Sequence, residues 1–232
     1  MKYRAFISYR HASSSEFAER LELAIKAYAK PIWQPPAAIF RDEKYLRPGA
    51  SLPQMIKEAL EQSDFLIYLA SPDAALSPWV VDELSQWCAV PDRIGKLIVV
   101  LTRGTIALDG GSRTIDWSNT DALPQMLQAV MPQVPLFVDC SRFIAPERQN
   151  LLDPDFKKAV NAIVAAIRGV DPIELSGQEI IQHRKNIRNR NALLGATAVM
   201  VILASIGAGI AIRQTDEAAH QSRVSRSAQL AS

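Results

Sequence analysis

Residues 65–84, FLIYLASPDAALSPWVVDEL, combine a short apolar run, a turn and the beginning of a helix. The run at 65–70 has the length of a strand, and its continuous apolar character is typical of a strand buried on both faces of a parallel sheet. Ser77 followed by Pro78 is typical of a helix start, because Ser caps the first turn and Pro fits its first position. This stretch therefore predicts one strand-to-helix unit of an α/β fold.

The same alternation recurs on both sides of this unit. Further apolar runs of strand length lie at 3–9, 37–41, 97–102 and 135–139. Apolar side chains at helical spacing lie between and after them, at Phe17, Leu21, Ile25 and Tyr28, at Met55, Ile56 and Leu60 behind Ser51, and at Phe156, Val160, Ile163 and Ile167 behind Asp153. Five strands with crossovers predict a flavodoxin-like, five-stranded parallel sheet flanked by helices, with its ligand crevice at the carboxyl ends of the strands. Residues 104–132 are predicted to be a long loop with one helix at 125–130.

The composition is that of a globular chain longer than one typical domain. The 232 residues are 48% hydrophobic and 22% charged, whereas a typical domain has about 100–150 residues. The net charge is +2, and no basic patch stands out in residues 1–170, so no nucleic-acid partner is expected. Two cysteines without a CxxC pair indicate buried, reduced thiols. Three scattered histidines lack metal-ligand spacing, so no metal and no other cofactor is expected.

Residues 192–212, ALLGATAVMVILASIGAGIAI, predict a transmembrane helix. These 21 residues carry no charge, and at about 1.5 Å per residue they can cross a hydrocarbon layer of about 30 Å. The alternative is a buried core helix, but such helices rarely run so long without a polar face. The flanking charges favour a cytoplasmic N-terminal domain by the positive-inside rule: Arg184, Lys185, Arg188 and Arg190 before the span, and Arg213, Asp216 and Glu217 after it.

The ends of the strands exclude two familiar protein classes with this sheet. The first strand ends in Phe6-Ile7-Ser8-Tyr9-Arg10, without the acidic cluster that a response regulator needs. The GxGxxG loop of a dinucleotide-binding fold is also absent.

Three motifs in order resemble those of bacterial TIR (Toll/interleukin-1 receptor) domains. FISYRH at 6–11 is similar to the first TIR box, FRDEKYLRPG at 40–49 to the second box with its BB loop, and SPWVVDEL at 77–84 to the segment with the catalytic glutamate. The resemblance covers residues 1–168 and implies the flavodoxin-like TIR fold. The common Trp-Cys pair is Trp79-Val80 here, and the region after the fourth strand is longer than in compact members. Some members cleave NAD at the nicotinamide–ribose bond, and others only recruit further TIR domains.

Glu83 is the predicted catalytic residue. Cleavage of the nicotinamide–ribose bond passes through an oxocarbenium-like state, which an anionic carboxylate stabilises. Trp79 precedes Glu83 by one helical turn, so both project from one stripe of the helix, and the indole is predicted to pack on the substrate. The alternative is an ordinary surface glutamate beside a packing tryptophan.

The remaining predicted substrate contacts come from the ends of the first two strands. Arg10 is predicted to bind the diphosphate, with Ser8 and Tyr9 on the same floor; its alternative is a surface arginine paired with an acid. Asp42 is predicted to bind a ribose hydroxyl or to begin the turn. The predicted mobile BB loop comprises Leu46, Arg47, Pro48 and Gly49.

The predicted organisation has four parts: a TIR domain at 1–168, a basic juxtamembrane linker at 169–191, a transmembrane helix at 192–212 and a polar, helical stalk at 213–232. This order is similar to bacterial TIR proteins in which a membrane helix leads to a sensor such as a WD-repeat propeller. The predicted function is a single-pass, membrane-anchored signalling protein with NAD as substrate, an NAD glycohydrolase or cyclase activated by TIR self-association under a stress such as phage infection. The alternative is a non-catalytic adaptor that acts through TIR–TIR contacts.

Overall fold

The computed structural model describes residues 3–28, 38–41, 52–110, 114–131, 136–143, 145–177 and 200. The chain divides into two units, Met1–Glu179 and Ile180–Ser232, and only Met200 of the second unit is described. The predicted span at 192–212 therefore lies outside the described residues apart from Met200, as do most of the linker and the whole stalk. Within the part of the chain that is described, no helix has both the length and the apolar character needed to cross a bilayer.

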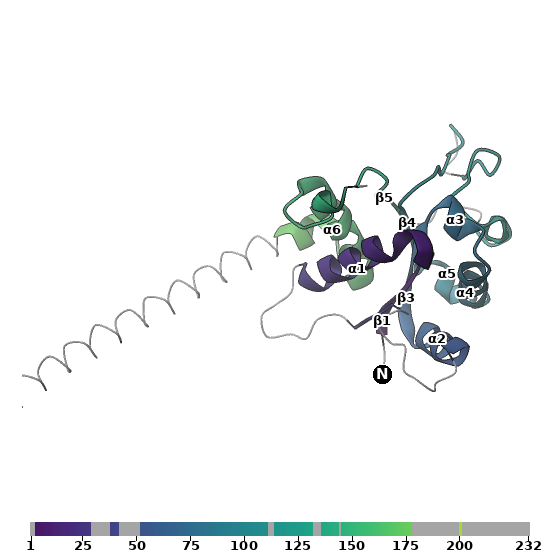
Figure 1. Ribbon diagram of the computed structural model, residues 1–232, viewed down its shortest axis with the longest axis horizontal. Coiled ribbons are helices and arrows are strands. Elements are labelled where there is room, and N and C mark those ends of the chain that lie inside the picture. Colours follow the sequence, from purple (N-terminus) through teal and green to yellow (C-terminus); the bar gives the residue numbers. More distant parts are fainter. Residues whose placement is uncertain are drawn as a thin grey trace, which may run out of the picture. The chain divides into compact units, whose positions relative to one another are not determined.

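Five parallel strands form one sheet within the described residues (Figure 1). They run in the order β2-β1-β3-β4-β5, which is the predicted flavodoxin-like arrangement. Their bounds are β1 (Tyr3–Ser8), β2 (Ile39–Phe40), β3 (Ser63–Ala70), β4 (Leu97–Leu101) and β5 (Leu136–Asp139). All five agree with the predicted apolar runs to within two residues at each end.

Helices cover both faces of the sheet, as Figure 1 shows. One face carries α1 (His11–Ala27) and α6 (Pro154–Arg168). The other carries α2 (Leu52–Glu61), α3 (Pro72–Ala75), α4 (Pro78–Cys88) and α5 (Pro91–Ile94). The predicted loop after β4 contains one 3₁₀ helix, η2 (Gln125–Ala129), and a second, η3 (Pro146–Arg148), follows β5.

Successive side chains of each strand enter different hydrophobic cores, because they point to opposite faces of the sheet. In β3, Ile67 and Leu69 pack with α1 and α6. Their neighbours Leu66 and Tyr68 pack on the other face with α4 and the loop after β4. The phenol of Tyr68 is fully buried and donates a hydrogen bond to the Ala122 carbonyl oxygen at 2.9 Å. Both faces of the sheet are therefore covered, as the continuous apolar runs predict.

The two cysteines lie in separate cores. Cys88 belongs to the core on the α4 side and Cys140 to the core on the α1 side, and both are free thiols. Burial raises the pKa of both thiols, that of Cys140 to about 12. The prediction of buried, reduced thiols is confirmed for both residues.

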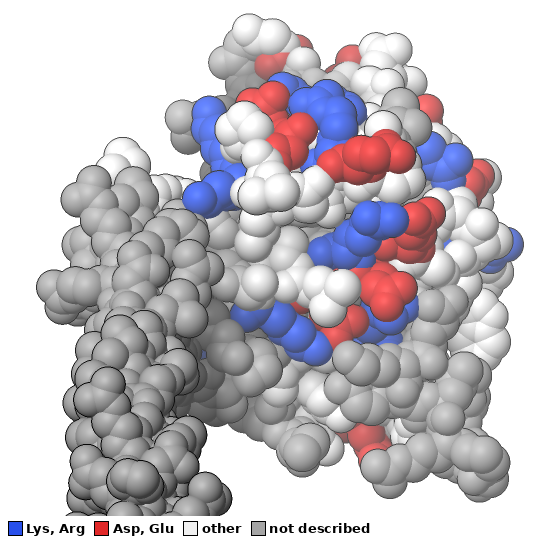
Figure 2. Space-filling view, turned by 60° about the vertical axis from the view of Figure 1, so that its left-hand side comes forward, with Lys and Arg blue, Asp and Glu red and all other residues white. Residues whose placement is uncertain are grey.

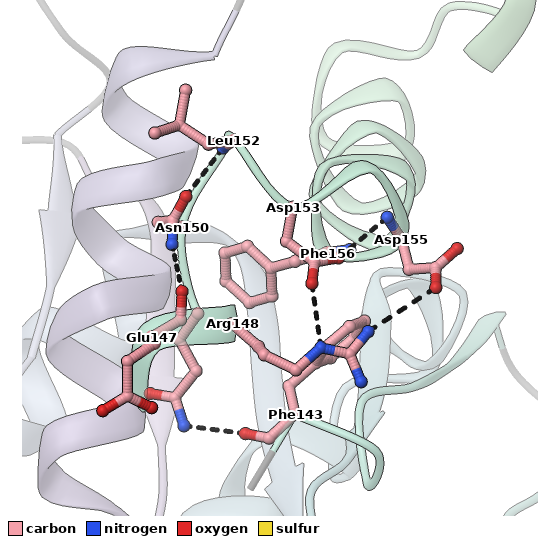
Figure 3. Close-up of polar contacts among 9 residues, drawn as sticks. Phe143, Glu147, Arg148, Asn150, Leu152, Asp153, Asp155 and Phe156 are labelled. Atoms are coloured by element: carbon pink, nitrogen blue, oxygen red, sulfur yellow. Dashed lines mark hydrogen bonds and ion pairs between the residues drawn. The ribbon is translucent and has the colours of Figure 1, made fainter. Parts of the chain in front are cut away.

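The last helix begins at the predicted cap. Asp153 Oδ1 accepts hydrogen bonds from the backbone nitrogens of Asp155 and Phe156 at 3.0 and 3.1 Å, as an N-cap does (Figure 3). Arg148 from η3 pairs with Asp153 at 2.9 Å and lies over the Phe143 ring at 5.5 Å. The first turn of α6 is thereby joined to the loop that follows β5.

α6 ends at Arg168, and the folded unit continues beyond it. Gly169 caps the helix in the left-handed conformation, with φ of 68°. Beyond it, residues 172–177 are helical, and Leu175 is fully buried in the core on the α1 side. The Asn161 side-chain amide donates to the Pro172 carbonyl oxygen at 2.8 Å. Residues past 168 thus pack as part of the first unit.

Charges of both signs are mixed on the surface. On the face drawn in Figure 2, the described Lys and Arg side chains lie interspersed with Asp and Glu side chains. Ion pairs such as Arg4–Asp64 and Arg20–Glu16 are of this surface kind. A nucleic acid is attracted by a continuous basic stripe, and the described residues of this face do not form one.

Candidate active site

A hollow of about 220 Å³ lies between α2 and α4. Each helix supplies half of its lining. The residues are Gln54, Ile56, Lys57 and Leu60 from α2, and Trp79, Asp82, Glu83 and Gln86 from α4. The hollow therefore contains both residues of the predicted catalytic stripe, together with polar groups that can contact a polar ligand.

The sequence of α4 explains why Trp79 and Glu83 share one wall. Val80, Leu84 and Trp87 are at most 1% exposed and face the core. Trp79 and Glu83 are one turn apart on the neighbouring stripe, so they project side by side. The Trp79 indole is 61% exposed, whereas Glu83 is only 9% exposed. The wall thus combines an open aromatic face with a nearly buried carboxylate.

Arg93 links the two helices that form the hollow. Its guanidinium lies 4.8 Å from the centre of the Trp87 ring, and the indole nitrogen of Trp87 donates to the Arg93 carbonyl oxygen at 2.8 Å. The same guanidinium donates to the carbonyl oxygens of Leu60 and Glu61 at the end of α2, at 3.3 and 2.6 Å. One side chain therefore ties α4 to α2 and sets the spacing of the two walls.

The Glu83 carboxylate is held from the sheet. The hydroxyl of Ser8, the last residue of β1, donates a hydrogen bond to Glu83 Oε2 at 2.5 Å. Ser8 is 1% exposed. The two residues are far apart in sequence, and the contact places the carboxylate at the carboxyl end of β1, where parallel α/β sheets bind their ligands. Of the predicted site residues, Ser8, Trp79 and Glu83 are brought together.

Arg10 lies beside the beginning of α4, outside the lining of the hollow. Its guanidinium is exposed and donates to the Ser77 hydroxyl at 3.4 Å. Ser77 is the N-cap of α4, so Arg10 contacts the start of the helix that carries Glu83. Diphosphate binding by Arg10 stays a prediction.

Tyr9 points to the opposite face of the sheet from Ser8. It is 3% exposed, stacks on the His11 ring at 4.8 Å and accepts a hydrogen bond from Arg41 at 3.5 Å. Arg41 also donates to Glu22 at 3.1 Å, and Glu22 pairs with Lys26. Burial lowers the pKa of Arg41, but the contacts with Tyr9 and Glu22 outweigh it, so the pKa is raised. Tyr9 therefore belongs to a buried charged cluster, and its predicted role in substrate binding stays a prediction.

Asp42 and the predicted BB loop, Leu46, Arg47, Pro48 and Gly49, lie outside the described residues. Ser51, the predicted cap of α2, is also outside them.

Several lining residues were missed by the sequence analysis. Gln54 and Lys57 lie on the polar side of the amphipathic α2, and Asp82 and Gln86 on that of α4. Gln54 donates to Glu58 at 2.9 Å, and Gln86 donates to Asp82 at 2.7 Å, so each wall carries a paired amide. The helical spacing of these polar positions was visible in the sequence. It does not tell which side of α2 faces α4, because that depends on tertiary packing.

The sheet order and the helices on both faces define an α/β domain of the flavodoxin-like class. The sequence profile of the TIR domain family matches residues 5–129, more than half of the chain, and the chain belongs to this family.

Comparison with individual proteins gives a sequence relative and a structural one. The chain is 33% identical over 214 residues to the protein named NAD(+) hydrolase ApTIR from Actinoplanes sp. (strain ATCC 31044 / CBS 674.73 / SE50/110). The match covers 91% of this chain and 29% of that protein, so the chain spans less than a third of the relative's length. Among solved structures, it is similar to the TIR domains of the activated Roq1 resistosome that recognises the pathogen effector XopQ. That similarity has a TM-score of 0.39 and 18% identity, covering 80% of this chain and 99% of that one.

Proposed function

We propose that this chain is an NAD glycohydrolase whose TIR domain breaks the bond between nicotinamide and ribose, with Glu83 as the catalytic residue. The observation that carries the proposal is the nearly buried Glu83 carboxylate beside the exposed Trp79 indole in one hollow. The relative named as an NAD(+) hydrolase supports the same chemistry for the shared region.

The reaction needs a negative charge more than it needs a proton donor. Nicotinamide is bound to ribose as a pyridinium ion, so when the C1′–N bond breaks, the electron pair stays on the ring nitrogen and neutral nicotinamide leaves. The positive charge then moves to C1′ and the ring oxygen of the ribose. A single carboxylate stabilises that charge. Water adds to C1′ and releases one proton, which gives ADP-ribose; attack by an adenine nitrogen would instead give a cyclic product.

The surroundings of Glu83 suit this role. A charge in a partly dry site acts more strongly on a nearby cation than it does in bulk water. The Trp79 indole offers a flat apolar surface on which nicotinamide or ribose can pack, and it keeps water away from the bond that breaks. Lys57 on the opposite wall offers a cation to a phosphate group of the substrate.

The test is nicotinamide release from NAD by the purified chain, measured by liquid chromatography with mass detection of the second product. Glu83→Gln should lower the rate about 100- to 1,000-fold, because it keeps the shape of the side chain and removes its charge. Asp73→Asn is the matched control, since it removes an exposed carboxylate from α3 outside the hollow, and it should keep the wild-type rate. If the wild-type chain releases no nicotinamide, either in solution or concentrated on vesicles, the function would be that of a non-catalytic adaptor.

We also propose that the TIR domain is anchored to a membrane, lies in the cytosol and is activated by self-association through the loop at 46–49. Support comes from the uncharged segment at 192–212 and from the basic residues that precede it. A helical stalk would follow, leading to a sensor domain such as a propeller. Alkaline extraction of membranes should leave the chain in the pellet, and a deletion of 192–212 should release it. A wild-type chain in the supernatant would contradict the anchor.

Self-association predicts a dependence on surface density. The rate of nicotinamide release per molecule should rise when the chain is concentrated on vesicles at constant total protein, because neighbouring TIR domains then meet more often. Linking binding sites typically raises their overall affinity about 100-fold or more. If the rate per molecule stays constant over a roughly 100-fold range of surface density, that result would contradict activation by assembly.

A further inference from the structure

The contact between Ser8 and Glu83 joins the site to the five-stranded sheet of the domain. β1 lies between β2 and β3 in the sheet, and Ser8 is in register with Tyr68 of β3. In the described residues β2 pairs with β1 at Ala5 and Phe6, so Ser8 is held by its pairing with β3 and by its burial, at 1% exposed, which leave it little freedom to move. The Ser8 hydroxyl is therefore a fixed point, and the 2.5 Å hydrogen bond extends that fixed point to the Glu83 carboxylate.

A glutamate on a helix needs such a support if its carboxylate is to stay in one place. The side chain has several rotatable bonds, and its ordering has an entropic cost. Val80 and Leu84 fix the helix from the core side, but they do not contact the substrate side. A hydrogen bond from a fixed hydroxyl selects one orientation of the carboxylate before the substrate binds, which is the kind of preorganisation that lowers an activation barrier.

The same hydrogen bond favours the ionised carboxylate. A hydroxyl that donates to a carboxylate stabilises its charged form. Among the described residues, the other charged groups that line the hollow are Lys57 from α2 and Asp82 from α4, and Arg10 lies beside the start of α4. Lys57 and Arg10 favour the ionised form and Asp82 opposes it, and the Ser8 hydroxyl adds to the favourable side.

Ser8 has no access to a substrate of its own. It is 1% exposed, it is not part of the lining of the hollow, and its hydroxyl is engaged by Glu83. We therefore propose that Ser8 is a positioning residue, which orients the Glu83 carboxylate and keeps it ionised, rather than a residue that contacts NAD. This inference rests on the proposed NAD glycohydrolase function.

The experiment compares Ser8→Ala with Ser8→Thr in the full chain, by nicotinamide release over a range of pH and NAD concentration. Ser8→Ala should lower kcat about 10- to 100-fold, with less than about a threefold change in KM, because only the orientation and charge of Glu83 are affected. The acid limb of its pH–rate profile should move to higher pH, because the hydrogen bond that stabilises the ionised carboxylate is lost. Ser8→Thr keeps the hydroxyl and should restore the wild-type acid limb.

Ser63→Ala is the matched control for the loss of a buried serine hydroxyl. Ser63 is 5% exposed, and its hydroxyl donates to the Ala59 carbonyl oxygen at 2.7 Å at the opposite end of the sheet. It should have the wild-type kcat and pH profile. The pH profile also separates a catalytic effect from partial unfolding, since a smaller folded fraction lowers the rate without moving the acid limb.

The outcomes distinguish this inference from the proposed function. A wild-type chain with no activity, or an active Glu83→Gln variant, would refute the function or the assignment of its catalytic residue. If the wild type is active and Glu83→Gln is not, then an unchanged kcat and acid limb in Ser8→Ala would overturn the positioning role. A rise in KM alone in Ser8→Ala would also overturn it, because that result would make Ser8 a substrate contact.

Discussion

Replacing Glu22 by Gln removes a carboxylate that lies between two cations in the interior of the domain. The Glu22 side chain is 2% exposed; one oxygen accepts from Arg41 Nε at 3.1 Å and the other pairs with Lys26. Glutamine keeps the shape of the side chain but carries no charge. Arg41 would then keep a buried positive charge without this counter-ion, because an arginine guanidinium stays protonated in proteins.

The expected loss of stability follows from the burial of the pair. Removing one partner of a buried ion pair costs about 3–5 kcal/mol. Lys26 is 20% exposed and can turn toward water, so the loss should lie near the lower end, at about 3 kcal/mol. For a domain of this size, that corresponds to a fall of roughly 6–12 °C in melting temperature.

The assay is urea denaturation of the purified chain, followed by tryptophan fluorescence. Glu16→Gln is the matched control on the same helix, because Glu16 pairs with Arg20 at 2.8 Å but both side chains are exposed, at 67% and 38%. Its loss should be no more than about 0.5 kcal/mol. Equal losses in Glu22→Gln and Glu16→Gln would refute the argument that burial decides the value of the pair.

Three further predictions concern other parts of the domain. Gly104→Ala should lower the free energy of unfolding by more than about 1 kcal/mol, because Gly104 has φ of +81° and a Cβ there would lie 2.5 Å from Asp121 Oδ1. Gly95 has open space around it, so Gly95→Ala should leave the free energy of unfolding unchanged. In the folded chain, Cys140 should resist a thiol reagent at about pH 8, which is near the ordinary pKa of a thiol, because burial raises its pKa to about 12. It should react once urea is added, and fast labelling of the folded chain would contradict this prediction. Two hydrogen bonds lower the pKa of Asp153: the one from the Phe156 backbone nitrogen contributes most, and the one from the Arg148 side chain comes second. The charge of Asp153 therefore stabilises the fold above about pH 4, and the advantage of wild type over Asp153→Asn in thermal melting should vanish as pH falls through that lowered pKa.

The fold was predictable because each strand is a continuous apolar run between helical patterns. Residues 65–70 and 97–101 have no charged position, which is the pattern of strands covered on both faces. The short helices α3 and α5 were missed, because four residues are too few to show helical spacing. Ser71-Pro72 nevertheless repeats the Ser-Pro signal of Ser77-Pro78, so α3 was within reach of the sequence.

The site was predictable only in part. Trp79 and Glu83 share a helix, and their spacing is sufficient to put them on one wall. The alternation of side chains along a strand would also have separated Ser8 from Tyr9, which the prediction treated as one floor. The bond from Ser8 to Glu83 and the approach of Lys57 on α2 depend on how helices pack on the sheet, and local spacing carries no information about that geometry.

The last residue of β1 and the next one along the chain serve different properties of the molecule. Ser8 contacts the Glu83 carboxylate on one face, and Tyr9 contacts the buried Arg41 on the other. We therefore expect substitutions at position 8 to change the turnover of the proposed reaction, and substitutions at position 9 to change the thermal stability of the domain. A saturation library over positions 8 and 9 would vary turnover and thermal stability almost independently. It is therefore a suitable starting point for engineering a more stable variant with unchanged turnover.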